Sequence, residues 1–111
     1  MGKKGRKKKV RYLQSRPKIL QFSPRGKAGR PDEVELAYDQ VEAVRLADFQ
    51  NLEQVEAAKI MRISRSTFGR ILREARRRLA DALVHGKSIR IRMGSAQIGF
   101  ISSRKQQPRT G

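Results

Sequence analysis

Arginine is the residue type in this sequence with the clearest chemical use, and seven arginines fall between Met61 and Leu79. A guanidinium group carries a rigid fork of N–H donors that matches phosphate oxygens and the O6/N7 edge of guanine. Polar and cationic residues recur there at steps of three and four, which places them on one stripe of a helix. The stripe consists of Ser66, Arg70, Arg73 and Arg77. It is suited to binding a polyanion.

A second stripe on the same stretch is apolar and would hold that helix against a core. It consists of Phe68, Ile71, Leu72, Ala75, Leu79 and Leu83. Ser64 is a favourable N-cap and Gly86 a favourable residue after a helix end, so the pattern predicts a helix over 65–85. A shorter helix over 53–61 precedes it, with Val55, Ala58 and Met61 inward. Residues 62–64 form the turn between the two, with Ile63 in the core.

Helix–turn–helix spacing divides the polar residues into two predicted groups, because the first turns of a second helix reach base edges and later turns meet phosphates. The base-facing group is Arg65, Ser66, Thr67, Arg70 and Arg73. The phosphate-binding group is Arg62, Arg76, Arg77, Arg78, Lys7, Lys8 and Lys9. The alternative is a solvated arginine face, which is common on surface helices.

The charge of the whole chain agrees with a polyanionic partner. Net charge is +17 over 111 residues and the pI is about 11.5. Residues 1–30 hold 12 Lys and Arg and no acid, whereas residues 31–61 hold 8 acids and 2 bases. Those values indicate nucleic acid as the partner, with the acidic block facing away from it. The chain has no cysteine, no apolar run of membrane-spanning length and no secretory signal, so we expect a cytoplasmic, nucleoid-associated protein without a membrane partner.

Composition also divides the chain into segments. Residues 1–17 are lysine-rich and residues 102–111 are basic and polar, so both are predicted to be disordered tails around a domain at 18–101. The first tail is either a phosphate-tracking arm or a solubilising segment.

Two short strands are predicted, over 18–22 and over 88–93, where Ile89, Ile91 and Met93 alternate with arginines. They could pair within one chain or across a dimer, and the sequence leaves a homodimer open. A further helix is expected from Asp39 to Asp48, with Val41, Val44 and Ala47 inward and Asp39 and Glu42 resembling a capping box. Residues 32–38 are either helical or extended.

Catalysis has few candidate residues. The single histidine, His85, lies at the C-terminus of a predicted helix, where a positive charge interacts favourably with the helix dipole. The glycines at 26 and 29 lack the GK[ST] ending of a phosphate-binding loop. We therefore expect no enzyme, no metal and no cofactor.

The segment from Tyr38 to Ile91 resembles a prokaryotic family of predicted DNA-binding proteins, the domain of unknown function one hundred and thirty-four. The resemblance lies in five motifs, at Glu42–Asp48, Glu56–Ala58, Ser64–Leu72, Ala75–Leu83 and Gly86–Ile91, with QFSP at 21–24 similar to the family's F-x-P element. Many members carry a CRRxC-like pattern in the basic N-terminal segment, where this chain has KKKVRY, so any metal or redox role does not transfer.

The resemblance implies a helix–turn–helix similar to region four of bacterial sigma factors. The expected fold is mainly α, with three helices, two short flanking strands and disordered basic tails. The expected function is sequence-specific binding of double-stranded DNA by a transcriptional regulator. Two alternatives are an RNA- or ribosome-associated basic protein, and a sigma-like module that docks on RNA polymerase through the acidic block from Asp32 to Glu56.

Overall fold

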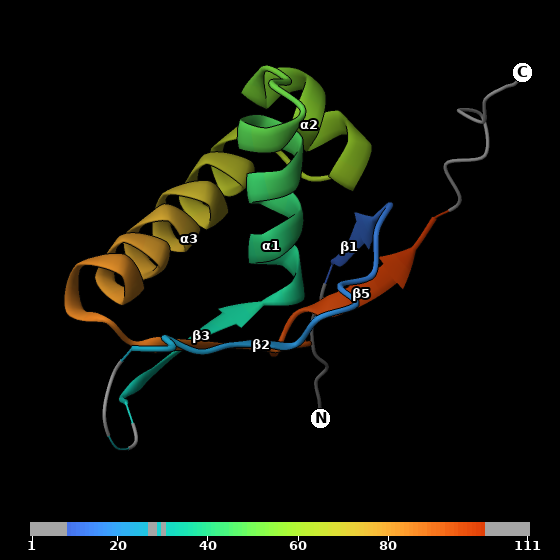
Figure 1. Ribbon diagram of the computed structural model, residues 1–111. Coiled ribbons are helices and arrows are strands. Elements are labelled where there is room, and N and C mark those ends of the chain that lie inside the picture. Colours follow the sequence, from blue (N-terminus) through green and yellow to red (C-terminus); the bar gives the residue numbers. More distant parts are fainter. Residues whose placement is uncertain (1–8, 27–28, 30, 102–111) are drawn as a thin grey trace, which may run out of the picture.

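The computed structural model describes residues 9–26, 29 and 31–101. It contains three α-helices, α1 (Tyr38–Val44), α2 (Gln54–Met61) and α3 (Arg65–His85), and a π-helical turn, η1 (Arg45–Phe49). The strands are β1 (Val10–Leu13), β2 (Gln21–Phe22), β3 (Glu33–Ala37), β4 (Ser88–Arg92) and β5 (Gln97–Phe100). In Figure 1 the helices group together, and β2 and β3 run beneath the lower end of α1. The prediction of three helices with short strands is confirmed, but the described residues form five strands rather than two.

Helix α3 begins and ends at the predicted residues. The Ser64 hydroxyl oxygen accepts a hydrogen bond from the Thr67 backbone N–H at 3.1 Å, and Gly86 closes the helix at φ 66°. Most of the predicted apolar stripe is buried, and Phe68 is fully so. Leu83 is 82% exposed, so its predicted burial is wrong. The apolar spacing continues beyond the part of the helix that the core covers.

Helix α1 runs directly into η1, and together they span the predicted helix to within one residue at each end. The capping box at Asp39 is wrong, because the helix begins one residue earlier. The N-cap residue is Ala37, whose backbone N–H donates to the Gln40 side-chain oxygen at 2.9 Å. Asp39 and Glu42 are instead buried in contacts with the N-terminal segment.

Helix α2 buries Ala57, Ala58 and Met61. Val55 is 46% exposed, so its predicted burial is wrong. The helix begins without a side-chain cap, since Glu53 makes no capping hydrogen bond.

Strand β4 lies at the centre of a three-stranded sheet, with β2 antiparallel on one side and β3 parallel on the other. The two predicted strands therefore pair within one chain, with Gln21 opposite Arg90. The first of them is shorter than predicted, because only Gln21–Phe22 of 18–22 is a strand. Residues 33–37 are extended rather than helical.

The fold also includes a segment that the sequence assigned to a tail. Strands β1 and β5 pair in parallel, and Leu13 of β1 is fully buried in the core. The prediction that residues 1–17 are disordered is therefore wrong for Val10–Leu13. The folded domain begins before residue 18. The predictions for Lys7, Lys8 and the tail at 102–111 lie outside the described residues.

Candidate nucleic-acid interface

A three-residue turn holds α2 and α3 together. Arg62 adopts the left-handed conformation at φ 60°, and the Ile63 backbone N–H donates to the Ala58 carbonyl at 3.1 Å. Ile63 is 9% exposed and belongs to the core, while Ser64 caps α3. The burial of Ile63 and the cap at Ser64 fix the position of the first turn of α3 relative to α2.

The side of α3 opposite the core is polar and cationic. Each residue turns an α-helix by about 100°, so positions three, four and seven apart share a face. Ser66, Arg70, Arg73 and Arg77, which we term the outward face, are all exposed. None of the three arginines makes an ion pair with any residue in the described part of the chain. The Arg70 guanidinium donates a long hydrogen bond to the Thr67 hydroxyl oxygen, at 3.5 Å.

On one flank of α3, the positive charge of Arg76 is neutralised by Asp48 near the end of η1. The Arg76 guanidinium donates to both oxygens of Asp48, at 2.7 and 3.1 Å. These hydrogen bonds lower the pKa of Asp48 below its usual value and raise the pKa of Arg76. Arg76 therefore already has a carboxylate partner, which a phosphate would have to displace.

The opposite flank is neutralised in the same way. Arg78 donates to Glu74 at 2.8 Å and to the Glu35 carbonyl oxygen at 2.8 Å. The hydrogen bond from Arg78 lowers the pKa of Glu74. Arg77 therefore belongs to the outward face, whereas Arg76 and Arg78 are paired on either side of it. Phosphate binding by these three arginines stays a prediction.

Other predicted site residues lie away from the outward face. Arg65 is exposed on the α2 side of α3, beside a hollow that Glu53 and Gln54 also line. Thr67 is half-buried and its hydroxyl oxygen accepts from Ser64 at 2.9 Å, so it belongs to the cap. Arg62 lies over the Tyr12 ring at 4.5 Å from the centroid, and Lys9 is exposed.

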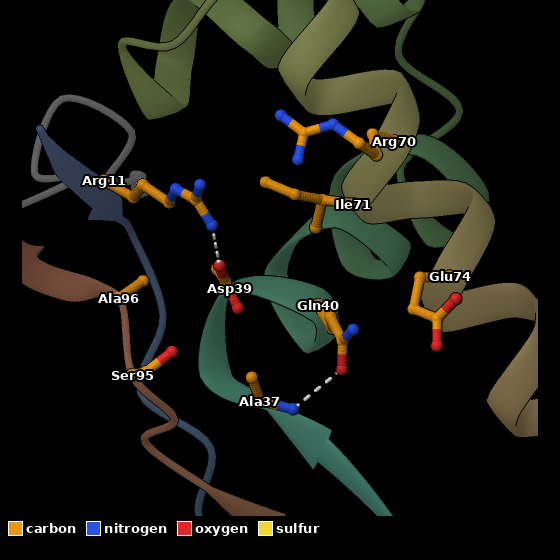
Figure 2. Close-up of a pocket in the computed structure, with 9 residues that line it drawn as sticks. All are labelled: Arg11, Ala37, Asp39, Gln40, Arg70, Ile71, Glu74, Ser95 and Ala96. Atoms are coloured by element: carbon orange, nitrogen blue, oxygen red, sulfur yellow. Dashed lines mark hydrogen bonds and ion pairs between the residues drawn. The ribbon is translucent and has the colours of Figure 1, made fainter.

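A hollow of about 340 Å³ borders the outward face. Figure 2 shows Arg70 and Glu74 on the α3 side of it, with Arg11 and Asp39 across from them. Arg11 of β1 is bound to Asp39 at 2.5 Å, so Arg70 is the cation at this edge without a carboxylate partner. Sequence reasoning missed Arg11. The alternation in Val10–Leu13 was its only signal, and the adjacent lysine run obscured it.

The acidic block at 31–61 is largely used within the chain. Five of its eight carboxylates form ion pairs, which are Glu33 with Arg90, Glu35 with Arg92, Asp39 with Arg11, Glu42 with Arg45 and Asp48 with Arg76. These acids neutralise cations of the sheet, β1, η1 and the flank of α3, and none of them pairs with an arginine of the outward face.

Within the described ranges, no helix has the length and apolar character needed to cross a bilayer. The same residues contain no group of three or more His, Asp or Glu side chains placed to hold a metal ion.

Comparison of the sequence with known proteins shows the family of the chain. Residues 1–99 match the family described as "Protein of unknown function DUF134", and the chain belongs to that family. A UPF0251 protein of Prosthecochloris aestuarii is 47% identical over 91 residues, which cover 81% of this chain and 59% of the relative.

Other relatives carry the same name. A UPF0251 protein of Thermoanaerobacter pseudethanolicus is 44% identical over 91 residues, covering 81% of this chain and 77% of its own length. A UPF0251 protein of Caldicellulosiruptor saccharolyticus is 47% identical over 94 residues, which cover 85% of this chain and 66% of the relative. The chain thus spans between about three fifths and four fifths of the length of these relatives. No solved structure gives a significant match.

Proposed function

We propose that α2, the turn at 62–64 and α3 form a helix–turn–helix that binds double-stranded DNA, and that the chain acts as a sequence-specific transcriptional regulator. The observation that carries this proposal is the outward face. Arg70, Arg73 and Arg77 are exposed without acid partners, whereas Arg76 and Arg78 on the flanks of the same helix are neutralised. Such a segregation of charge suits a helix lying in the major groove.

Position along α3 assigns a role to each residue of the outward face. Ser66, Arg70 and Arg73 lie in the first turns, the part of a recognition helix that reaches base edges. Arg77 lies one turn further on and would contact the phosphate backbone. Arg62 is exposed just before α3 and Lys9 is exposed just before β1, and both would add salt-sensitive contacts to phosphates.

The remaining arginines are assigned to positioning rather than to DNA. Arg76 and Arg78 link α3 to η1 and to β3 through Asp48 and Glu35. Each guanidinium is already hydrogen-bonded within the chain, so neither is assigned a direct contact with DNA.

The polymerase-docking alternative has less support. It needed a free acidic surface, and five carboxylates of the acidic block are already bound to this chain's own arginines. The RNA alternative predicts tighter binding to structured RNA than to duplex DNA, which a competition experiment distinguishes.

Two variants with equal change of charge test the proposal. Arg73→Ala removes a cation of the outward face and Arg76→Ala removes a paired one, and both would be titrated with labelled duplex DNA by fluorescence anisotropy. A specific arginine–base contact is worth about 1–3 kcal/mol, so Arg73→Ala should weaken binding roughly 5- to 150-fold to a selected site. Arg76→Ala should stay within about threefold of wild type, since Asp48 already neutralises it. Equal losses in both variants would mean that total charge, not the outward face, determines binding.

A further inference from the structure

An apolar groove opens between α1, α3 and the three-stranded sheet. Its volume is about 280 Å³, and its lining includes Val41 and Val44 of α1, Leu79 of α3, and Phe22 and Ile89 of the sheet. Phe22 is 51% exposed at this site. Interiors of folded proteins are normally close-packed, so an open groove lined only by apolar side chains lacks a covering group.

A side chain of complementary character stands next to the groove. Leu83 lies one turn beyond Leu79 on α3, and it is 82% exposed, followed by Val84 at 74%. Leu83 projects from the same helix that forms one wall of the groove, but it does not line the groove itself. Leu83 and the apolar groove therefore lie next to each other, and neither is covered by any residue that the structure describes.

The charges around this end of α3 are neutralised. Asp81 pairs with Lys87 at 3.0 Å and with His85 at 2.7 Å, and Glu33 pairs with Arg90 at 3.1 Å on the neighbouring sheet. In a chain with net charge +17, self-association is opposed wherever arginines are uncompensated, as on the outward face. At the C-terminal end of α3 the charges are mostly paired, and Arg77 is the cation of the outward face that borders it, so a second copy meets less repulsion here than along the outward face.

The parts of the chain outside the described residues offer no occupant of the right chemistry. Residues 1–8 and 102–111 read MGKKGRKK and SSRKQQPRTG, and positions 27, 28 and 30 are Lys, Ala and Arg, so Met1 is the only large apolar residue among them. A second copy, by contrast, supplies Leu83.

We infer that two copies associate about a two-fold axis, with Leu83 of each inserted into the groove of the other beside Leu79 and Phe22. A knob adjacent to its own complementary groove is the arrangement that a closed, isologous pair requires, because each contact is then made twice.

The length of α3 connects this pairing to DNA, in a step that rests on the proposed function. Arg70 lies 11–13 residues from an axis placed between Asp81 and Leu83, which is about 17–20 Å along the helix at 1.5 Å per residue. If the two helices are roughly collinear, the two Arg70 residues lie about 33–39 Å apart. That range includes the 34–36 Å between half-sites one turn apart on B-DNA.

Sedimentation velocity of the full chain without DNA tests the association. The wild type is expected to be a dimer, and Leu83→Asp a monomer with at least a tenfold higher dissociation constant. Phe49→Asp is the matched control, because Phe49 is 81% exposed on η1, away from the groove. It should remain a dimer. A monomeric wild type, or a dimer unaffected by Leu83→Asp, would overturn the inference and leave the groove to another occupant.

Cross-linking locates the contact. The chain has no cysteine, so a mixture of Leu83→Cys and Phe22→Cys chains can form disulfides only through the introduced thiols. Mass spectrometry should find the peptide that joins positions 83 and 22 after mild oxidation, and should not find one joining 83 and 49 in the corresponding Phe49→Cys mixture. The reverse pattern would contradict the assigned contact.

Binding to duplexes that carry one or two half-sites tests the dimer and the DNA-binding function separately. Leu83→Asp should bind one half-site like wild type and lose the tighter binding to two half-sites spaced one helical turn apart. A dimer that binds no DNA would refute the proposed function alone. A monomer whose DNA binding depends on Arg70 would refute the pairing alone.

Discussion

Glu42 joins α1 to the N-terminal segment, and its removal should destabilise the fold strongly. Its side chain is 1% exposed, bonds to Arg45 through both oxygens at 2.9 Å, and accepts the Gln14 backbone N–H at 2.8 Å. Removing one partner of a buried ion pair costs about 3–5 kcal/mol, since the other charge is left uncompensated. Arg45 keeps its hydrogen bond to Gln14 and is 23% exposed, which favours the lower end, about 3 kcal/mol, for Glu42→Ala.

Urea unfolding followed by helical circular dichroism measures this cost, and the chain has no tryptophan to follow instead. Glu42→Gln should cost less, about 1–2 kcal/mol, because its amide oxygen still accepts the Gln14 N–H. Glu56→Ala is the control: Glu56 is exposed on α2, and its loss should change the free energy of unfolding by no more than about 0.5 kcal/mol. A cost below about 1 kcal/mol for Glu42→Ala would refute the reasoning, as would equal costs for the two Glu42 variants.

Three further predictions concern other parts of the fold. Ser64→Ala removes the N-cap of α3 and should lower the free energy of unfolding by about 1 kcal/mol in urea titrations. Gly94→Ala should cost about 1–3 kcal/mol by the same measurement, because Gly94 has φ +86° and an added Cβ would lie 2.8 Å from the Ala37 Cβ. Asp48→Asn removes a carboxylate whose pKa the Arg76 hydrogen bonds lower from 3.8, so its stabilisation is present above that value and lost as the pH falls below it. The Asp48–Arg76 pair is exposed, so Asp48→Asn should lower the free energy of unfolding by less than about 1 kcal/mol at neutral pH. This loss should vanish in acid, and a loss that grows as the pH falls would contradict the expected pH dependence.

Local patterns predicted α3 and β4 from the sequence because their signals lie within the elements themselves. Ser64 and Gly86 bound α3, and alternation over 88–92 identified β4. β1 was missed because its four residues follow a lysine run, whose charge predicted disorder. β5 was missed because Gln97–Phe100 is only four residues long and contains a glycine, a residue type depleted in strands.

Contacts between distant residues account for the other differences. Asp39 and Glu42 looked like a helix cap at the level of local spacing, but their partners Arg11 and Gln14 lie 28 residues away in the sequence. Leu83 continues the apolar spacing of α3 after the core has ended. The outward face itself was predicted, and the ion pairs that separate it from Arg76 and Arg78 could be found only in three dimensions.

Selection of bound duplexes from a random pool tests the central claim most directly, that the outward face of α3 binds DNA with sequence specificity. The wild type should enrich one recurrent motif, and Arg70→Ala should relax the preference at one position of that motif while leaving the others. No enrichment by the wild type, or an identical motif from Arg70→Ala, would contradict the account.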